Sequence, residues 1–192
     1  MNTATVNTAT CNTATFNTAT FNSAPLSHGA STIDILSVSR FLLREARLLD
    51  DEQWDEWLTC YHPEAQYWMP SWDDDDALVS DPQREISLIF YPNRQGLEDR
   101  IFRIKTERSS ATMPGTRTSH NLSNIEIEQI DGALCTVRYN WNTLSHRYKI
   151  DYSHFGMTRC VIDFSGPAPQ IRDKYIVLKN DYIHQVIDIY HI

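Results

Sequence analysis

Between residues 31 and 107, apolar residues recur in three segments at the spacing of amphipathic helices. A first helix is predicted after Ser31, which matches a capping box together with Asp34, and it ends at Asp50-Asp51. These two aspartates can cap a second, shorter helix that His62-Pro63 ends. A third helix is predicted up to Glu107. The apolar residues that define the three helices are Ile35, Val38, Phe41, Leu42, Leu48 and Leu49, then Trp54, Trp57, Leu58 and Tyr61, then Leu97, Ile101 and Ile104.

From Thr118 onward the pattern is almost wholly that of strands. Apolar and polar residues alternate on both sides of Asp131-Gly132, which is a strong hairpin signal. Another strand is predicted over Met157 to Phe164. The last stretch, Lys174 to Ile192, has apolar residues at both odd and even positions, which is typical of strands covered on both faces. Asn180-Asp181 within it predicts a hairpin or tight bend between two such strands.

Two shorter apolar runs lie earlier in the chain. Ala65 to Trp68 is predicted to be a strand, whereas Glu85 to Tyr91 fits a strand or a short helix equally well. Three helices followed by a long antiparallel meander indicate an α+β fold. In such a fold the helices, all in the N-terminal half, pack on one face of a curved, mostly antiparallel sheet.

The length of 192 residues suits one folded domain, which we expect to span residues 31–192. Residues 1–30 differ in composition, because they contain no Asp, Glu, Lys or Arg and repeat the unit NTAT. A period of five fits neither a helix nor a strand with an inner face, so we expect a disordered low-complexity tail. The tail lacks the charged and apolar regions of a secretory signal.

The net charge of −8 therefore lies entirely on residues 31–192. Without a basic stripe, nucleic acid is not an expected partner. No apolar run approaches the roughly 20 residues that a membrane helix needs. The four cysteines, Cys11, Cys60, Cys135 and Cys160, are widely spaced, which indicates reduced thiols in a cytoplasmic protein.

Three short motifs contain residue types that bind metals, but none of them forms a complete ligand set. Cys60-Tyr61-His62 matches half of a Rieske motif, and the second half is missing because the next cysteine, Cys135, has no histidine after it. Asp181, His184 and His191 match a two-histidine, one-carboxylate iron triad in type only, since residues three apart on a strand point to opposite faces. The run Asp73 to Asp76 lacks the alternate spacing and the glycine of a calcium loop. We therefore expect no catalytic, cofactor-binding or metal-binding residue in this chain.

Several longer motifs resemble one family, the small (β) subunits of aromatic-ring-hydroxylating dioxygenases. The order of elements is that of the NTF2-like (cystatin-like) α+β cone, and the resemblance covers roughly residues 33 to 192. The C-terminal stretch resembles the benzoate/toluate branch in particular. The matching segments are Tyr67 to Asp76, Glu85 to Ile89, Leu97 to Arg100, Arg103 to Ser110, Thr116 to Asn121 and Val177 to Ile192.

This resemblance implies a partner and a function for the assembled enzyme. The large (α) subunit of such enzymes holds a Rieske [2Fe–2S] cluster and a mononuclear Fe(II), and a reductase supplies electrons from NADH. The small subunit is a non-catalytic, structural part of an α3β3 hexamer. The holoenzyme would cis-dihydroxylate a benzoate-type aromatic carboxylate in aromatic compound catabolism.

Two alternatives remain open at the level of sequence. A stand-alone lyase or isomerase of the same fold would use a His/Asp dyad, for which His120 is a candidate, although it is near Asp99 only in sequence. An aromatic-ligand binding module would need an open cone. Bulky side chains could instead fill the cone; the candidates are Trp68, Tyr139, Trp141 and Phe164.

One segment has the composition of a subunit interface. Aromatic and methionine side chains are typical anchors of a buried interface, with charges at its rim. These types occur together between Trp68 and Asp76. The predicted interface residues are Trp68, Met69, Trp72, Asp73, Asp74, Asp75 and Asp76.

Overall fold

The structure, a computed structural model, describes residues 33–73, 76–106, 115–184 and 186–192. The predicted tail over residues 1–30 lies outside this range. Within the described residues, no helix is long and apolar enough to cross a membrane.

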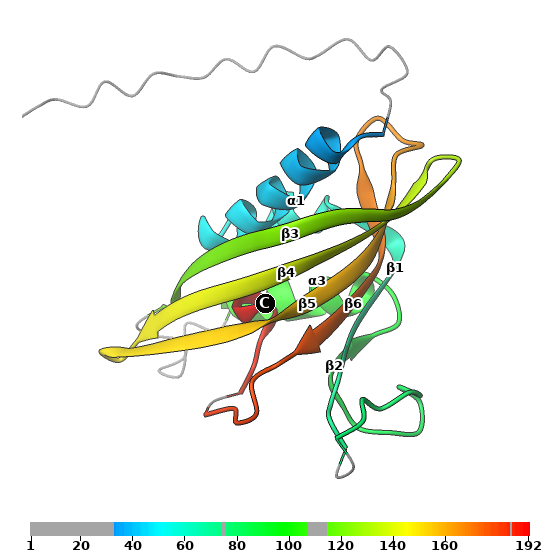
Figure 1. Cartoon of the computed structure of the whole chain (residues 1–192). Coiled ribbons are helices and arrows are strands. Elements are labelled where there is room, and N and C mark those ends of the chain that lie inside the picture. Colours follow the sequence, from blue (N-terminus) through cyan, green and yellow to red (C-terminus); the bar gives the residue numbers. More distant parts are fainter. Residues whose placement is uncertain (1–32, 74–75, 107–114, 185) are drawn as a thin grey trace, which may run out of the picture. The chain divides into compact units, whose positions relative to one another are not determined.

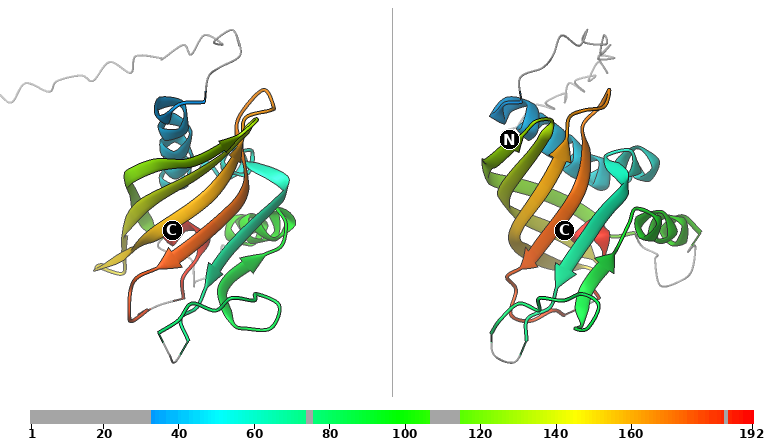
Figure 2. Two further views of the ribbon diagram at one scale, coloured as in Figure 1. Left: turned by 45° about the vertical axis from the view of Figure 1, so that its right-hand side comes forward. Right: turned by 90° about the vertical axis from the view of Figure 1, so that its right-hand side faces the viewer.

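A six-stranded sheet with the order β2-β1-β6-β5-β4-β3 forms the centre of the fold (Figure 1). All neighbouring strands are antiparallel except β1 and β6, which run side by side in the same direction (Figure 2). The sheet is therefore curved and mostly antiparallel, as the sequence predicts. The strands are β1 (Tyr61–Pro70), β2 (Ser87–Tyr91), β3 (Arg117–Asp131), β4 (Leu134–Arg147), β5 (Ile150–Asp163) and β6 (Gln170–Leu178).

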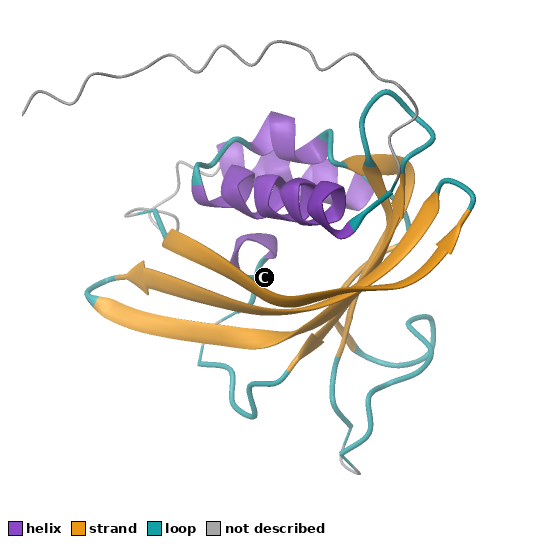
Figure 3. Cartoon of the chain, turned by 45° about the horizontal axis from the view of Figure 1, so that its top comes forward, coloured by secondary structure: helices purple, strands orange, loops and turns teal. Residues whose placement is uncertain are grey.

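Helices cover one face of this sheet (Figure 3). They are α1 (Ile35–Asp50), α2 (Trp54–Leu58) and α3 (Gln95–Thr106), and a short 3-10 helix, η1 (Ile189–His191), lies on the same side. The inward-facing residues of β4 alternate with outward-facing ones from Cys135 to Ser145, as the sequence pattern predicts. Tyr139 and Trp141 point inward and fill the cone, whereas Trp68 and Phe164 are only partly buried.

The helix boundaries differ from the predicted ones at two places. Asp34 is the N-cap of α1 and forms the capping box with Ser37, one turn later than the box predicted at Ser31. The second helix ends at Leu58, and Tyr61 and Pro63 belong to β1 rather than to a helix end. A proline is tolerated there because the β1–β6 register shifts between Tyr61 and Gln66, where no ladder donor is needed.

The predicted terminal hairpin is wrong. The chain leaves the sheet after β6, because the side chain of Asn180, and not its backbone, bonds the next residues of β5. Its Oδ1 accepts a hydrogen bond from Phe155 N, and its Nδ2 donates one to Ser153 O. The following residues then turn under the sheet and end in η1, where Ile189 and Ile192 are buried. The apolar residues of this stretch therefore do not mark a strand: Ile189 and Ile192 are buried inside the cone, whereas Tyr182 and Val186 are exposed.

Candidate functional site

The interior of the cone contains a histidine–carboxylate dyad. Asp50, at the end of α1, accepts a hydrogen bond from the His120 backbone N–H at 3.0 Å and lies 2.6 Å from His120 Nδ1. Thr118 Oγ1 donates to the same carboxylate at 2.9 Å. These hydrogen bonds outweigh the effect of partial burial and lower the pKa of Asp50. His120 is thus paired with Asp50 and not with Asp99, which was its neighbour only in sequence.

The dyad has no room for a substrate. The His120 side chain is 3% exposed, and its Nε2 has no hydrogen-bond partner within the described part of the chain. The cavity that it lines, together with Tyr139, Trp141 and Thr158, measures only about 10 Å³. That volume is comparable to a single water molecule. A substrate for lyase or isomerase chemistry could not enter without displacing the aromatic core.

A second buried cluster crosses the cone beside the dyad. Glu45 Oε1 accepts hydrogen bonds from Trp57 Nε1 at 2.9 Å, Tyr61 OH at 2.7 Å and Lys174 Nζ at 2.8 Å. Both Glu45 and Lys174 are 3% exposed. Burial alone would raise the pKa of Glu45, but the Lys174 ammonium and the three hydrogen bonds lower it below its usual value. The cluster joins α1, α2, β1 and β6 and is saturated by its own members.

The sequence-predicted metal candidates do not come together. Cys60 is buried, and burial with the nearby Glu45 carboxylate raises the pKa of its thiol to about 11, so it stays protonated. His62 Nδ1 accepts a hydrogen bond from Glu64 N. Among the residues that the structure describes, no group of three or more His, Cys, Asp or Glu side chains could hold a metal ion.

The predicted iron triad is also dispersed. Asp181 and His184 are exposed, and the His184 ring packs edge-on against Tyr182. His191 is buried, and its Nδ1 accepts a hydrogen bond from Asp188 N at 3.0 Å. Burial, together with nearby cationic and histidine side chains, lowers the pKa of His191 to about 3, so it is neutral. It serves as part of the cap of η1.

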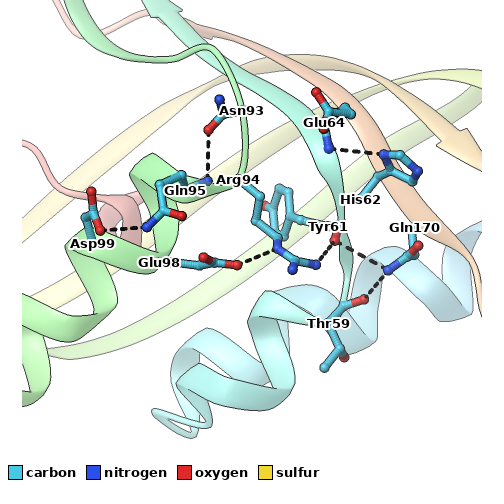
Figure 4. A network of polar contacts seen from close by, with 10 residues as sticks. All are labelled: Thr59, Tyr61, His62, Glu64, Asn93, Arg94, Gln95, Glu98, Asp99 and Gln170. Atoms are coloured by element: carbon cyan, nitrogen blue, oxygen red, sulfur yellow. Dashed lines mark hydrogen bonds and ion pairs between the residues drawn. The ribbon is translucent and has the colours of Figure 1, made fainter.

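A polar network joins the start of α3 to the beginning of β1 (Figure 4). Arg94 donates to Tyr61 O at 3.0 Å and to Glu98 Oε1 at 2.8 Å, and Gln170 Nε2 donates to Thr59 O at 3.2 Å. A polar hollow of about 290 Å³ lies beside Arg94 and Glu98. Because these groups bond one another and peptide carbonyls, the network fixes the α2–β1 connection rather than presenting a reactive group.

The predicted interface segment divides between core and surface. Met69 is fully buried in the core, whereas Trp68 lies partly exposed on the face opposite to the helices, against Phe90 and Tyr175. The Trp72 side chain is 45% exposed although its Nε1 donates to Leu178 O at 2.7 Å. Of the four aspartates, Asp73 and Asp76 are exposed, and residues 74–75 lie outside the described part of the chain.

The Glu45–Lys174 pair and the Asp50–His120 pair were not found by sequence reasoning. One signal was present, because Glu45 lies on the apolar face of the first helix, three residues after Leu42. A charged residue at such a position needs a buried partner. Its partners, however, are 12, 16 and 129 residues away, and no local pattern identifies them.

Comparison with known proteins gives consistent matches. A family model described as "Ring hydroxylating beta subunit" matches residues 44–185. The benzoate 1,2-dioxygenase subunit beta of Acinetobacter baylyi is 70% identical over 161 residues, which are 84% of this chain and 95% of that protein. The toluate 1,2-dioxygenase subunit beta of Pseudomonas putida is 60% identical over 162 residues, covering 84% and 99% of the two chains.

A solved structure agrees with these sequence matches. The crystal structure of the beta subunit of benzoate 1,2-dioxygenase from Burkholderia mallei is 62% identical, with a TM-score of 0.74 over 84% of this chain and 99% of that one. The α+β cone that the element order predicts is therefore confirmed. The resemblance to ring-hydroxylating small subunits, which rests on the motifs between Tyr67 and Ile192, is confirmed as well.

Proposed function

Because the chain belongs to the family of ring-hydroxylating beta subunits, we propose that it is the small subunit of a dioxygenase that acts on benzoate or a closely related aromatic carboxylate. The observation that carries this proposal is the 70% identity to a benzoate 1,2-dioxygenase subunit beta over nearly its whole length. Within the assembled enzyme, the reaction would be cis-dihydroxylation of the ring with O2.

In this proposal the chain has a structural role. Its buried histidine–carboxylate dyad, Asp50–His120, borders a cavity of about 10 Å³, and the Glu45–Lys174 ion pair is saturated by its own hydrogen bonds. The large subunit would hold the Rieske [2Fe–2S] cluster and the mononuclear Fe(II), and a reductase would supply electrons from NADH. We further propose an α3β3 hexamer in the cytoplasm, where the buried thiols of Cys60, Cys135 and Cys160 stay reduced.

We also propose that Trp68, Trp72 and the aspartates from Asp73 contribute to a subunit interface. The support is the partial exposure of the two indole rings, together with the exposed Asp73 and Asp76 that follow Trp72 in the chain. Large aromatic side chains anchored by a single hydrogen bond are well suited to bury apolar area against a partner. Met69 would support this surface from the core rather than contact the partner.

Co-expression with a large subunit of a benzoate 1,2-dioxygenase tests the proposed function. We expect both chains to co-elute in equal amounts, with iron in the complex and O2 uptake that depends on benzoate, NADH and reductase. The chain expressed alone serves as the matched control and should show neither iron nor turnover. Failure to co-elute, or full turnover by the chain alone, would contradict the proposal.

A further inference from the structure

The β4–β5 hairpin ends in a tight turn at one side of the sheet (Figure 1), and a basic pocket lies at this turn. It measures about 360 Å³ and is lined by Gly115, Arg117, His146, Arg147, Tyr148 and Lys149. Arg117 begins β3 and is the register partner of His146 on β4. Tyr148 and Lys149 form the two-residue turn to β5, and both have positive φ, 52° and 66°. This turn places their side chains next to the start of β3.

The pocket concentrates positive charge in a chain whose net charge is −8. Three permanently cationic side chains line it, and none of the described lining residues carries a carboxylate. The side chains of Arg117 and Lys149 are exposed, and neither forms a hydrogen bond or ion pair with any residue that the structure describes. His146 has an acidic partner, Asp151, at 2.5 Å on the exposed surface. Cations elsewhere are commonly paired, as Arg94, Arg159 and Arg172 are.

Arg147 provides a second, independent observation that points to an anion. Its Nε is buried and has no hydrogen-bond partner within the described part of the chain. The guanidinium lies 4.8 Å from the centroid of the Tyr148 ring, and its Nη2 makes one long contact of 3.4 Å to Tyr148 OH. A buried charged donor without an acceptor is costly, and an anion in the pocket would satisfy it.

We propose that this pocket binds a small carboxylate anion, with Arg117, Arg147 and Lys149 as donors. A guanidinium presents two parallel N–H groups that match the two oxygens of a carboxylate. The Tyr148 ring, which is 55% exposed, offers a flat surface for a planar ring attached to that carboxylate. The volume of about 360 Å³ lies in the range of small-molecule pockets. The inference does not depend on the proposed function.

Titration of the full-length chain with sodium benzoate tests this site. Binding is measured by calorimetry and by the NMR signals of the backbone amides of residues 146–150. We expect saturable binding with shifts centred on this turn. Benzyl alcohol has the same ring without the charge and should not bind, and sodium acetate should bind more weakly. The double variant Arg117→Gln/Lys149→Gln should weaken benzoate binding by about tenfold, because it removes two charged donors.

A matched control removes the same net charge elsewhere. Arg84→Gln/Lys179→Gln changes two exposed cations away from the pocket and should alter benzoate affinity by less than about twofold. Equal weakening in both double variants, or no saturation by about 10 mM benzoate, would overturn the proposal. So would displacement of benzoate by equimolar chloride. If benzoate fails to bind but Arg117→Gln/Lys149→Gln weakens assembly with the large subunit, the pocket takes a partner's carboxylate side chain, and the small-ligand proposal is wrong.

Discussion

Glu45 and Lys174 form a buried ion pair in the interior of the described structure. Their Oε1 and Nζ atoms are 2.8 Å apart, and both side chains are almost fully buried. A buried ion pair gains little net free energy, since desolvation offsets most of the attraction. Loss of one partner destabilises the fold, because the charge of the remaining partner stays unpaired in an apolar interior. The pair therefore fixes the arrangement of α1 against β6.

Replacement of Lys174 by methionine should lower the free energy of unfolding at pH 7 by about 3–5 kcal/mol, because it leaves the Glu45 carboxylate without its cation. Urea denaturation of the full-length chain measures this change. The double variant Glu45→Gln/Lys174→Met keeps an acceptor for Trp57 and Tyr61 but has no buried charge, so it should recover much of the loss. A double variant as unstable as Lys174→Met would show that lost packing, not charge, is responsible.

The effect of Lys174→Met should also depend on pH. In the native chain the pKa of Glu45 is lowered, so its contribution to stability is present above the unfolded-state value of about 4.3 and is lost only as pH falls below it. Without Lys174, burial raises that pKa, and the folded state then prefers the protonated acid. The deficit of the variant should be largest at pH 7 and should shrink toward pH 5. Equal deficits at both values would contradict this assignment.

At the scale of elements, the sequence pattern predicted correctly those elements that contacts between nearby residues determine. Alternation in β4 and the Asp131-Gly132 signal placed the β3–β4 hairpin, where Gly132 adopts a positive φ of 58°. The stretch after Leu178 was predicted wrongly to be a strand. Apolar residues at both odd and even positions occur in an irregular segment with buried residues as well as in a buried strand. The course of this stretch is set by Asn180 and by the ion pair of Arg100 with Asp188, 88 residues apart, which no local pattern contains.

The contact between β5 and β6 depends on Gly156. A Cβ atom at this position would lie 1.9 Å from Val177 O and 2.9 Å from Trp141 Cζ2. Since the first of these atoms belongs to the backbone, the strands must separate to admit a methyl group. Gly156→Ala should therefore cost about 1–3 kcal/mol or more of unfolding free energy, measured by urea denaturation.

Gly166→Ala provides the control for this prediction. A Cβ atom there would have its nearest neighbour, Ala168 O, at 3.5 Å, which is an ordinary contact. We expect a change of less than about 1 kcal/mol, with either sign. If both alanine variants have the same stability, the close approach at Gly156 is not a constraint on the sheet.

At the scale of the whole molecule, assembly should depend on Trp72 more than folding does. The side chain is 45% exposed and lies at the end of β6 through its bond to Leu178 O. Trp72→Ala should weaken assembly with the large subunit by about 2 kcal/mol, measured by the concentration dependence of size-exclusion profiles. The isolated variant should keep its circular dichroism spectrum and unfold cooperatively. Unfolding of the free variant would instead assign Trp72 to the stability of the monomer.

Deletion of residues 2–25 should leave the melting temperature and assembly nearly unchanged. The first described helix starts at Ile35, and its cap is complete with Asp34 and Ser37. Differential scanning calorimetry and size-exclusion chromatography of the shortened chain check this expectation. A fall of several degrees in melting temperature would mean that the uncharged repeat supports the domain.

The parallel pairing of β1 with β6 has a consequence for biosynthesis. β1 is complete at Pro70, but its partner begins only at Gln170, so one edge of β1 stays open while a hundred further residues are translated. Closing so long a loop costs conformational entropy, and the contacts between β1 and β6 that offset this cost form only when both strands are present. We therefore expect the N-terminal helices and β1 to remain a partly formed layer during translation, with their apolar face accessible to chaperones, until β6 has been synthesised.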